Sequence, residues 1–462
     1  MIKKLKINNF KSWHSTGDIH FSNLTGFFGT NSSGKTALLQ YLLLLKQTAE
    51  SSDRHQVLDL GSDKTIIELG TFKDLIFNHN TKEALESEIN WQLKEPSLKI
   101  YHPAKKDAVL FKGSDLSFKS SISLTEKERP CVESFSYTFD SYRFRMTKLN
   151  SEKHEYDLSV ETITGREKEF EFRRTPGRAW PLPEPVKFYG FPDQVKAYYQ
   201  NAGFLSDFPL QLEELFKRVY YLGPLRDYPR RYYTYAGAQP ADMGRRGELV
   251  IDAILASRDR GEKISRGKGR GNVRYTLEEY VAHWLKELNL IDEFKVEPVT
   301  KGSKLFQVKL RIAPGSPEAL ITDVGFGVSQ ILPVITLCYY VPRGSILIIE
   351  QPEIHLHPKV QAGLADVFID AISKRDIQII LESHSEHLLR RFQRRIAENE
   401  FDDKLASLYF CKTSEGKSTL EKLELDTYGN IRNWPEGFFG DEMSEIAAMA
   451  EAVYRRKSKT DE

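Results

Sequence analysis

The sequence is poor in cysteine, lacks a long apolar run and carries almost no net charge. Its three cysteines, Cys131, Cys338 and Cys411, form no CxxC pair, so we expect buried free thiols in a reducing compartment. The longest apolar run, residues 331–341, is too short to cross a bilayer, and residues 1–10 alternate like a strand and not like a signal peptide. We therefore expect a cytoplasmic protein with no membrane partner. With 66 Lys and Arg against 65 Asp and Glu, a global basic field that would collect nucleic acid is excluded.

A glycine-rich segment, GTNSSGKT, lies between an expected strand, residues 24–28, and an expected apolar helix, residues 37–45. Gly29 and Gly34 let successive backbone N–H groups curl around a phosphate where a Cβ would clash. The helix that follows points its positive end at the same oxygens. The pattern GxxxxGKT between a strand and a helix therefore predicts an ATP-binding loop.

The chemistry of a bound nucleotide suggests roles for three further residues. Lys35 is expected to bridge the β- and γ-phosphates, and the Thr36 hydroxyl to bind Mg²⁺. P-loop proteins also need an acidic residue at the end of a neighbouring strand, and an apolar run ends in Glu350. A helix over residues 360–372 and a strand over 377–381 are expected to follow. Parallel α/β sheets place ligands at such strand ends, so we predict a metal site at Thr36 and Glu350.

Three segments carry a resemblance to a known group: GTNSSGKT, SILIIEQPEIHLHP and IILESHSEHLL. Together they resemble the ABC-type ATPases of the RecF, SMC and OLD lineage. The resemblance implies an α/β fold with an ABC-type P-loop head, a mixed sheet flanked by helices, an antiparallel β lobe and a helical, basic insertion. It also implies a head-to-tail homodimer or higher oligomer that closes on ATP, with His384 sensing the γ-phosphate and residues 355–358 contacting the partner protomer. No heptad run of three or more repeats occurs, so no long coiled coil is expected.

Four histidines near this site, His355, His357, His384 and His387, raise the alternative of a zinc site. Their spacing matches no usual metal cluster. The resemblance accounts for all but His387 without a metal, so ATP and Mg²⁺ are the expected cofactors.

The first departure from the family lies in the signature loop, expected at residues 323–333. Gly327 aligns with the signature glycine, whereas Gly325 takes the usual serine position, so Ser329 would have to supply the hydroxyl. The residues expected to bind the nucleotide are Lys11, Gly29, Asn31, Ser32, Ser33, Gly34, Lys35, Thr36, Gly327 and Ser329.

The second departure is Gln351, at the position of the glutamate that polarises the attacking water in the family. Glutamine can orient water but cannot take up a proton at neutral pH. Glu353 could act as the base if the turn brings it near the γ-phosphate. The expected catalytic residues are therefore Glu353, Gln351 and His384, and both slow hydrolysis and binding without hydrolysis stay open.

We expect five segments along the chain. They are 1–59, the P-loop half of the head; 60–200, the antiparallel β lobe; 201–300, a helical insertion with a basic loop; 301–415, the second half of the head; and 416–462, a C-terminal cap and helix. Alternating patterns predict strands over 135–144 and 170–172 within the lobe, and apolar periodicity predicts helices over 210–219 and 249–257.

Two basic stretches could bind DNA. Arg and Tyr are interleaved over residues 226–235, which suits phosphates and stacked bases but also suits a buried or dimer-contact surface. Residues 258–274 hold seven basic residues and four glycines, which suits contact with the DNA backbone and equally suits a solvated loop. DNA therefore stays open as a partner.

Only 78 residues follow His384 (462 − 384), too few for the TOPRIM nuclease of OLD proteins, so we expect no nuclease domain. Residues 425–439 resemble the closing element of a prokaryotic subfamily of predicted ATPases. Standalone ATPases of this build accompany a separately encoded nuclease or effector in bacterial anti-phage defence, for example of the Septu kind. The resemblance therefore implies an ATPase subunit that regulates such a partner. Two alternatives are a non-hydrolysing ATP-binding scaffold, favoured by Gln351, and a RecF-like DNA repair ATPase, favoured by residues 258–274.

Overall fold

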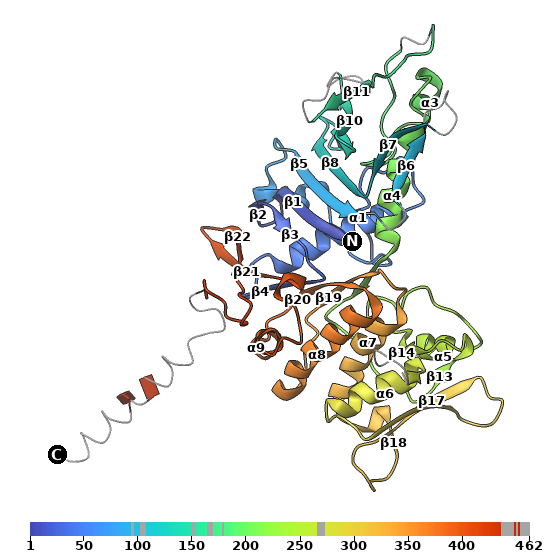
Figure 1. Cartoon of the computed structure of the whole chain (residues 1–462), viewed down its shortest axis with the longest axis vertical. Coiled ribbons are helices and arrows are strands. Elements are labelled where there is room, and N and C mark those ends of the chain that lie inside the picture. Colours follow the sequence, from blue (N-terminus) through green and yellow to red (C-terminus); the bar gives the residue numbers. More distant parts are fainter. Residues whose placement is uncertain are drawn as a thin grey trace.

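The computed structural model describes residues 1–93, 97–101, 108–149, 154–163, 170–177, 180–265, 273–435, 448–449 and 451–452. The molecule is elongated, with an antiparallel β lobe at one end, a central sheet in the middle and a helical lobe at the other end (Figure 1). The fold is mixed α/β: an eight-stranded and a six-stranded sheet and their helices are arranged in layers, and smaller sheets accompany them. Among the described residues, no helix combines the length and the apolar character that spanning a membrane requires.

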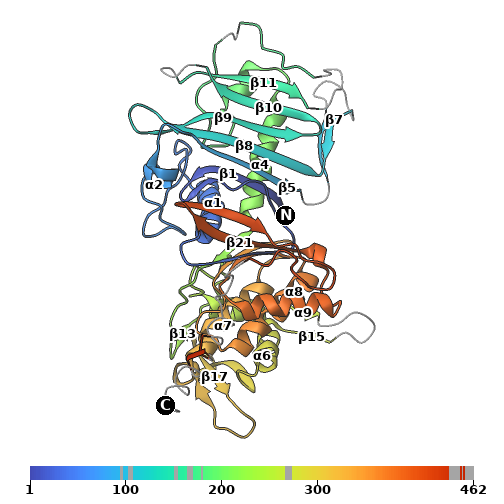
Figure 2. The same cartoon turned by 90° about the vertical axis from the view of Figure 1, so that its left-hand side faces the viewer.

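The first sheet, here called the lobe sheet, is antiparallel and has the order β11-β10-β9-β8-β5-β1-β2, with β3 paired to β1. Its strands are β1 (Ile2–Phe10), β2 (Trp13–Ser15), β3 (Ile19–His20), β5 (Leu85–Gln92), β8 (Asp115–Leu124), β9 (Pro130–Phe139), β10 (Tyr142–Lys148) and β11 (Tyr156–Thr162). Helix α4 (Asp207–Lys217) covers one face of this sheet (Figure 2). Its Phe208 ring lies 5.5 Å from the Tyr137 ring and 5.4 Å from the Phe144 ring. Aromatic packing therefore joins α4 to β9 and β10.

The second sheet, here called the central sheet, has the order β12-β19-β20-β4-β21-β22 and is parallel except for β22. Its strands are β4 (Leu24–Gly29), β12 (Val219–Leu222), β19 (Ile346–Glu350), β20 (Gln378–Glu382), β21 (Ala406–Ser414) and β22 (Lys417–Lys422). Strand β20 lies between β4 and β19, so the carboxyl ends of these three strands adjoin. Glu350 is paired in register with Glu382. This edge of the sheet carries the candidate site.

Both faces of the central sheet are buried. Ile348 and Ile380 belong to the core that contains α1 (Lys35–Glu50) and the lobe sheet, whereas Ile349 and Leu381 belong to the core of the helical lobe. Because side chains alternate between the faces of a strand, a strand buried on both faces is a continuous apolar run. This burial explains the uninterrupted apolar stretches before Glu350 and Glu382.

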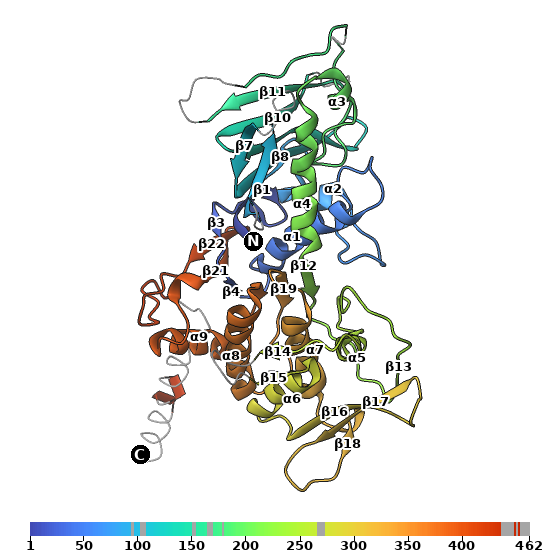
Figure 3. The same ribbon diagram turned by 45° about the vertical axis from the view of Figure 1, so that its right-hand side comes forward.

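The helical lobe covers the face of the central sheet opposite to α1 (Figure 3). It contains α5 (Val250–Asp259), α6 (Leu277–Glu287), α7 (Phe326–Tyr340), α8 (Pro358–Arg375) and α9 (Glu386–Ala397), with a small sheet of β13 (Tyr233–Thr234), β16 (Glu293–Pro298), β17 (Leu305–Arg311) and β18 (Ala319–Leu320). Helix α7 contacts α5, α6 and α8, which explains why its sequence is apolar on all sides. Short elements complete the description: α2 (Phe72–Leu75), α3 (Gln194–Tyr198), β6 (Leu98–Tyr101), β7 (Val109–Gly113), β14 (Ile264–Ser265) and β15 (Arg274–Tyr275).

Three expected elements differ from the structure. The strand predicted over 135–144 is two strands, β9 and β10, because Asp140 (φ 46°) and Ser141 (φ 71°) form a two-residue turn. Residues 170–172 form no strand. The helix predicted over 210–219 ends at Lys217, where the chain enters β12. Much of the expected C-terminal helix, residues 436–447, 450 and 453–462, lies outside the described residues.

Candidate nucleotide-binding site

The glycine-rich loop connects β4 to α1, as its sequence predicts. Gly29 has φ 140° and Gly34 has φ 88°, both in the region that favours glycine. A Cβ on Gly29 would lie 2.0 Å from the Cys411 carbonyl oxygen, and one on Gly34 would lie 2.4 Å from Ser418 Oγ. Both positions therefore require glycine for conformation and for space. Gly34 is also the N-cap of α1, so the helix N-terminus opens onto the loop.

A cavity of 340 Å³ lies over this loop. It is lined by Lys11, Ser12, Asn31, Ser32, Ser33, Gly34, Lys35, Thr36, Ala37, Gln40, Gln351, Glu382 and His384. The structure thus brings all the predicted loop residues except Gly29 together with two of the predicted catalytic residues. Gly29, Glu350, Glu353, Gly327 and Ser329 do not line this cavity.

Lys35 is folded back onto the loop. Its Nζ donates hydrogen bonds to the carbonyl oxygens of Gly29 (3.1 Å) and Thr30 (2.7 Å). Burial lowers the pKa of Lys35, while the charge of Glu382 opposes that shift. A phosphate in this cavity would give the ammonium group an anionic partner in place of neutral carbonyls.

The start of the chain supports the loop from behind, which the sequence analysis missed. Trp13 is fully buried, and its Nε1–H donates to the Gly34 carbonyl oxygen at 3.0 Å. Ser418 of β22 donates to Ser12 at 2.7 Å between their Oγ atoms. Lys11 Nζ donates to Gln40 Oε1 on α1. Only Lys11 of these residues was among the predicted ones, because the others are recognisable only once β2 and β22 meet in space.

Three buried carboxylates stand beside the loop, and burial raises the pKa of each. Glu382 accepts hydrogen bonds from the Thr36 hydroxyl at both oxygens, 3.0 Å and 2.8 Å. Glu350 Oε1 accepts from the Tyr221 hydroxyl at 2.9 Å, and Glu353 Oε1 accepts from the backbone N–H of His384 at 2.6 Å. Thr36 is therefore hydrogen-bonded to Glu382, for which the sequence predicted no role. Glu350, which the sequence predicted as the partner of Thr36, is held by Tyr221 instead. Burial, followed by the charge of Glu382, raises the pKa of Glu350 to about 7.

The donor set fits Mg²⁺. A hydroxyl and two carboxylates beside the loop supply the hard oxygen ligands that this ion prefers, and a divalent cation there would offset the burial and the mutual repulsion that raise the pKa of Glu350. Within the described ranges, no three His, Cys, Asp or Glu side chains are grouped as ligands for a metal such as zinc. Magnesium at Thr36 therefore stays the prediction for this edge of the sheet.

His384 and Gln351 enter the cavity from the turns after β20 and β19. Burial and the charge of Lys35 lower the pKa of His384, so its ring is neutral at neutral pH. Gln351 has φ 42°, and its backbone N–H donates to the Glu382 carbonyl oxygen at 2.8 Å. The backbone conformation at Gln351 thus fixes the point at which its side chain projects from the end of β19.

The expected signature segment forms the N-terminus of α7, with Gly325 as the N-cap. Ser329 is buried and its hydroxyl donates to the Phe326 carbonyl oxygen at 2.7 Å. The Phe326 ring lies 5.6 Å from the Tyr228 ring and 5.3 Å from the His355 ring. This segment lines a separate cavity of 260 Å³, which shares no lining residue with the loop cavity.

The interleaved Arg and Tyr stretch is partly internal. Arg226 is buried, and its Nη2 donates to the Glu350 carbonyl oxygen at 3.2 Å, while Nε and Nη1 have no hydrogen-bond partner among the described residues. Burial lowers its pKa to about 10. Arg230 pairs with Asp227 at 3.1 Å. Arg226 thus supports the carboxylate edge of the sheet and is not available to DNA.

The second basic stretch is only partly described. Arg258 pairs with Glu278, and Arg260 pairs with Glu262 at 2.9 Å. Residues 266–272, which hold three of its seven basic side chains, lie outside the described residues. Arg258 and Arg260 are therefore engaged within the protein, whereas Arg274 is exposed.

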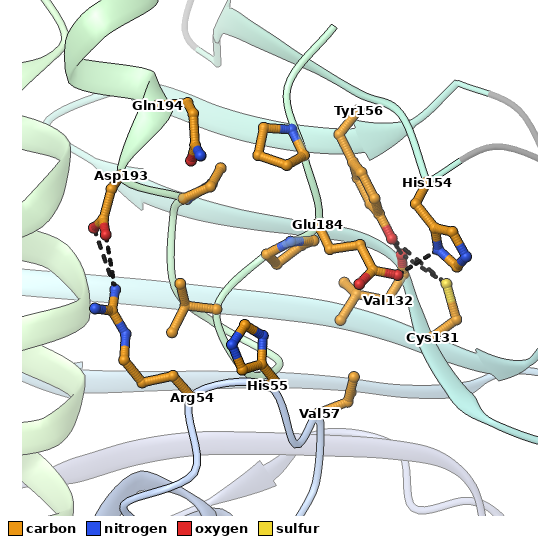
Figure 4. A pocket seen from close by; sticks show the side chains of 14 residues that line it. Arg54, His55, Val57, Cys131, Val132, His154, Tyr156, Glu184, Asp193 and Gln194 are labelled. Atoms are coloured by element: carbon orange, nitrogen blue, oxygen red, sulfur yellow. Dashed lines mark hydrogen bonds and ion pairs between the residues drawn. The ribbon is translucent and has the colours of Figure 1, made fainter.

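A larger cavity, 520 Å³, lies in the β lobe and not at the strand ends (Figure 4). Arg54 pairs with Asp193 at 3.2 Å, and His154 pairs with Glu184. The Arg54 cation is already paired with a carboxylate, whereas Lys35 Nζ in the loop cavity donates to neutral carbonyls. The chemistry of a triphosphate therefore favours the smaller cavity.

Comparison with protein families finds two matching families. Residues 24–390 match the family described as "AAA domain, putative AbiEii toxin, Type IV TA system", and residues 402–449 match a family described as a protein of unknown function. Comparison with curated proteins finds no match.

Among solved structures, the chain is similar to heads of SMC proteins. An SMC head bound to the C-terminal winged-helix domain of ScpA is 11% identical, with 92% of this chain and 98% of that chain covered and a TM-score of 0.45. The SMC head domain from Thermotoga maritima is 11% identical, with 92% and 99% covered and a TM-score of 0.39. An SMC head with an extended coiled coil, bound to the C-terminal domain of ScpA and derived from Pyrococcus furiosus, is 10% identical, with 98% and 99% covered and a TM-score of 0.42.

Proposed function

The chain belongs to the AAA-domain family that matches its residues 24–390, and we propose that it is an ATP-dependent subunit that controls a separately encoded nuclease or effector in bacterial defence. The cavity over the loop carries the nucleotide part of this proposal, because it gathers Lys35, Thr36 and His384 around one helix N-terminus. The family's description, which names a toxin of a toxin–antitoxin system, supports the defence part. The sequence resemblance to ATPases of the Septu kind supports it independently.

We propose that two copies close head to tail around ATP. The loop cavity and the N-terminus of α7 share no lining residue within one chain, so a second copy could bring its own α7 onto the γ-phosphate. The turn is open enough for this: a Cβ on Gly327 would meet nothing closer than 3.7 Å, and one on Gly325 nothing within 4 Å. The positive end of a helix stabilises an anion placed against it.

Within the cavity, each proposed role follows from the chemistry of the side chain. Lys35 binds phosphate oxygens, and bound Mg²⁺, held by Thr36 at the strand end that carries Glu350, would neutralise phosphate charge. His384, neutral at neutral pH, can exchange hydrogen bonds with the terminal phosphate. Gln351 orients water but takes no proton. Glu353, whose pKa is raised by burial, lies outside the lining of the cavity, so it would take the proton only once the turn after β19 brings it to the terminal phosphate.

The first test measures ATP binding and turnover by the full chain. Lys35→Ala is expected to abolish both, whereas Lys82→Ala, at an exposed position outside the cavity, leaves them unchanged. A wild-type chain that binds no ATP would refute the nucleotide site. Tight binding with background turnover would replace the hydrolysing subunit by the non-hydrolysing scaffold, the outcome that Gln351 favours.

The defence part needs a separate test, because it depends on a partner. We expect the chain to co-purify with the product of an adjacent gene that encodes a nuclease or another toxic effector. Adjacent genes without any such product would contradict this part and leave the ATP-binding proposal standing.

A further inference from the structure

Glu382 occupies a position that calls for a cation. It is the last residue of β20, between β4 and β19, and only 2% of it is exposed. Among the described residues it forms no ion pair; its side-chain hydrogen-bond partners are the Thr36 hydroxyl, at both oxygens, and the neighbouring Gln351 amide. The charge of Lys35 acts on it from nearby, but Lys35 Nζ donates its hydrogen bonds to carbonyl oxygens and not to Glu382. Burying a carboxylate whose direct partners are all neutral is costly. A function for the charge would explain why the fold tolerates it.

Glu350 and Glu382 are held differently although they are paired in register. The Tyr221 hydroxyl, 2.9 Å away, holds one oxygen of Glu350 on the side of β12. Glu382, in contrast, lines the loop cavity together with Thr36. Of the two carboxylates, Glu382 therefore faces the space where a nucleotide-bound cation would lie.

We infer that Glu382 binds the divalent cation beside Thr36, and that Glu350 supports it from the adjoining strand. This inference rests on the proposed function, because it concerns the cation that accompanies ATP in the same cavity. The inference adds Glu382 to the predicted metal-binding residues. Glu382 lies two positions before His384, at the end of β20, which runs between β4 and β19. The inference also explains why the Thr36 hydroxyl, which would bind the same ion, is hydrogen-bonded to Glu382.

The test compares the affinity for a non-hydrolysable ATP analogue in excess Mg²⁺ and in EDTA, by titration calorimetry on the full chain. For Glu382→Gln, we expect the gain in affinity that Mg²⁺ confers to fall at least ~10-fold. Its affinity in EDTA is expected to stay equal or to rise, because a negative charge near the phosphates is removed. Glu382→Asp keeps the charge on a shorter side chain and is expected to retain part of the gain. Glu126→Gln, at an exposed turn between β8 and β9, is the matched control and should behave as wild type.

The outcomes separate this inference from the proposed function. If the wild-type chain binds the analogue and Glu382→Gln keeps the full Mg²⁺ gain, the inference is overturned and the ATP site stands. A wild-type affinity that is the same in Mg²⁺ and EDTA overturns the inference as well. A wild-type chain that binds no analogue overturns both. Thermal unfolding in EDTA checks that Glu382→Gln is folded. If it is not, the gain in affinity that Mg²⁺ confers on Glu382→Asp decides whether the inference stands.

Discussion

Replacing Glu350 with glutamine is expected to stabilise the ligand-free protein at neutral and alkaline pH. The carboxyl group is 5% exposed, and burial beside Glu382 raises its pKa from 4.5 to about 7. Its ionised form is therefore disfavoured in the folded chain. Glutamine is neutral and nearly isosteric, and its amide oxygen can still accept the Tyr221 hydroxyl. The variant thus removes the cost of the charge while it preserves the packing.

The sign and size of the effect follow from proton linkage. Between pH 4.5 and about 7 the folded chain holds a proton on Glu350 that the unfolded chain has released, so the free energy of unfolding of the wild type falls as the pH rises. Above that range the loss is constant, and the interval between the two pKa values sets it at up to about 3 kcal/mol. Glu350→Gln should therefore exceed the wild type only slightly at pH 5 and most at pH 8.

Thermal unfolding in EDTA at several pH values between 5 and 8 measures this difference. The exposed carboxylate variant Glu126→Gln controls for the general loss of one negative charge. A Glu350→Gln variant whose melting temperature differs from the wild type by the same amount at every pH would refute the reasoning. So would a variant that is less stable than the wild type at pH 8.

Three further substitutions test the geometry of the loop and the turn beside it. Gly34→Ala places a Cβ 2.4 Å from Ser418 Oγ at φ 88°, so we expect the free energy of unfolding to fall by about 1–2 kcal/mol. We also expect ATP binding to be lost, as measured by calorimetry, and an unchanged affinity would contradict the need for glycine. Trp13→Phe removes the N–H that donates to the Gly34 carbonyl oxygen, which should lower stability by about 1 kcal/mol and weaken ATP binding, whereas wild-type melting and affinity would show that the bond is dispensable. Gln351→Glu supplies a proton acceptor and should raise ATP turnover roughly 10²-fold; turnover that does not change would place water activation elsewhere.

The parts of the fold that the sequence predicts are those with local causes. The loop glycines, the apolar helix behind them and the strands that end in Glu350 and Glu382 each reflect a requirement of their own segment. Burial on both faces makes such strands continuous apolar runs, and a phosphate loop needs glycine at set positions. The observed α8 and β20 therefore begin and end close to their predicted bounds, and β19 ends at Glu350 as predicted, whereas α1 continues to Glu50, beyond its predicted end at residue 45.

The parts that the sequence does not predict depend on which segments meet. The contact between Thr36 and Glu382 exists because β20 lies between β4 and β19, and strand order is not written in either segment. Trp13 reaches the loop only because β2 pairs with β1. The turn at Asp140 was missed for a different reason: neither it nor the next residue is glycine, the residue that usually marks a positive φ.

Mixing two defective variants tests most directly whether two copies of the chain share the nucleotide site. Lys35→Ala disables the loop but leaves the α7 turn intact, and Gly327→Arg blocks the turn but leaves the loop intact. Each variant alone should fail to retain a labelled ATP analogue with Mg²⁺ through gel filtration, and an equal mixture should retain it at the one intact site of each mixed dimer. If the mixture retains no more than the two variants do separately, the nucleotide is not enclosed between two copies of the chain.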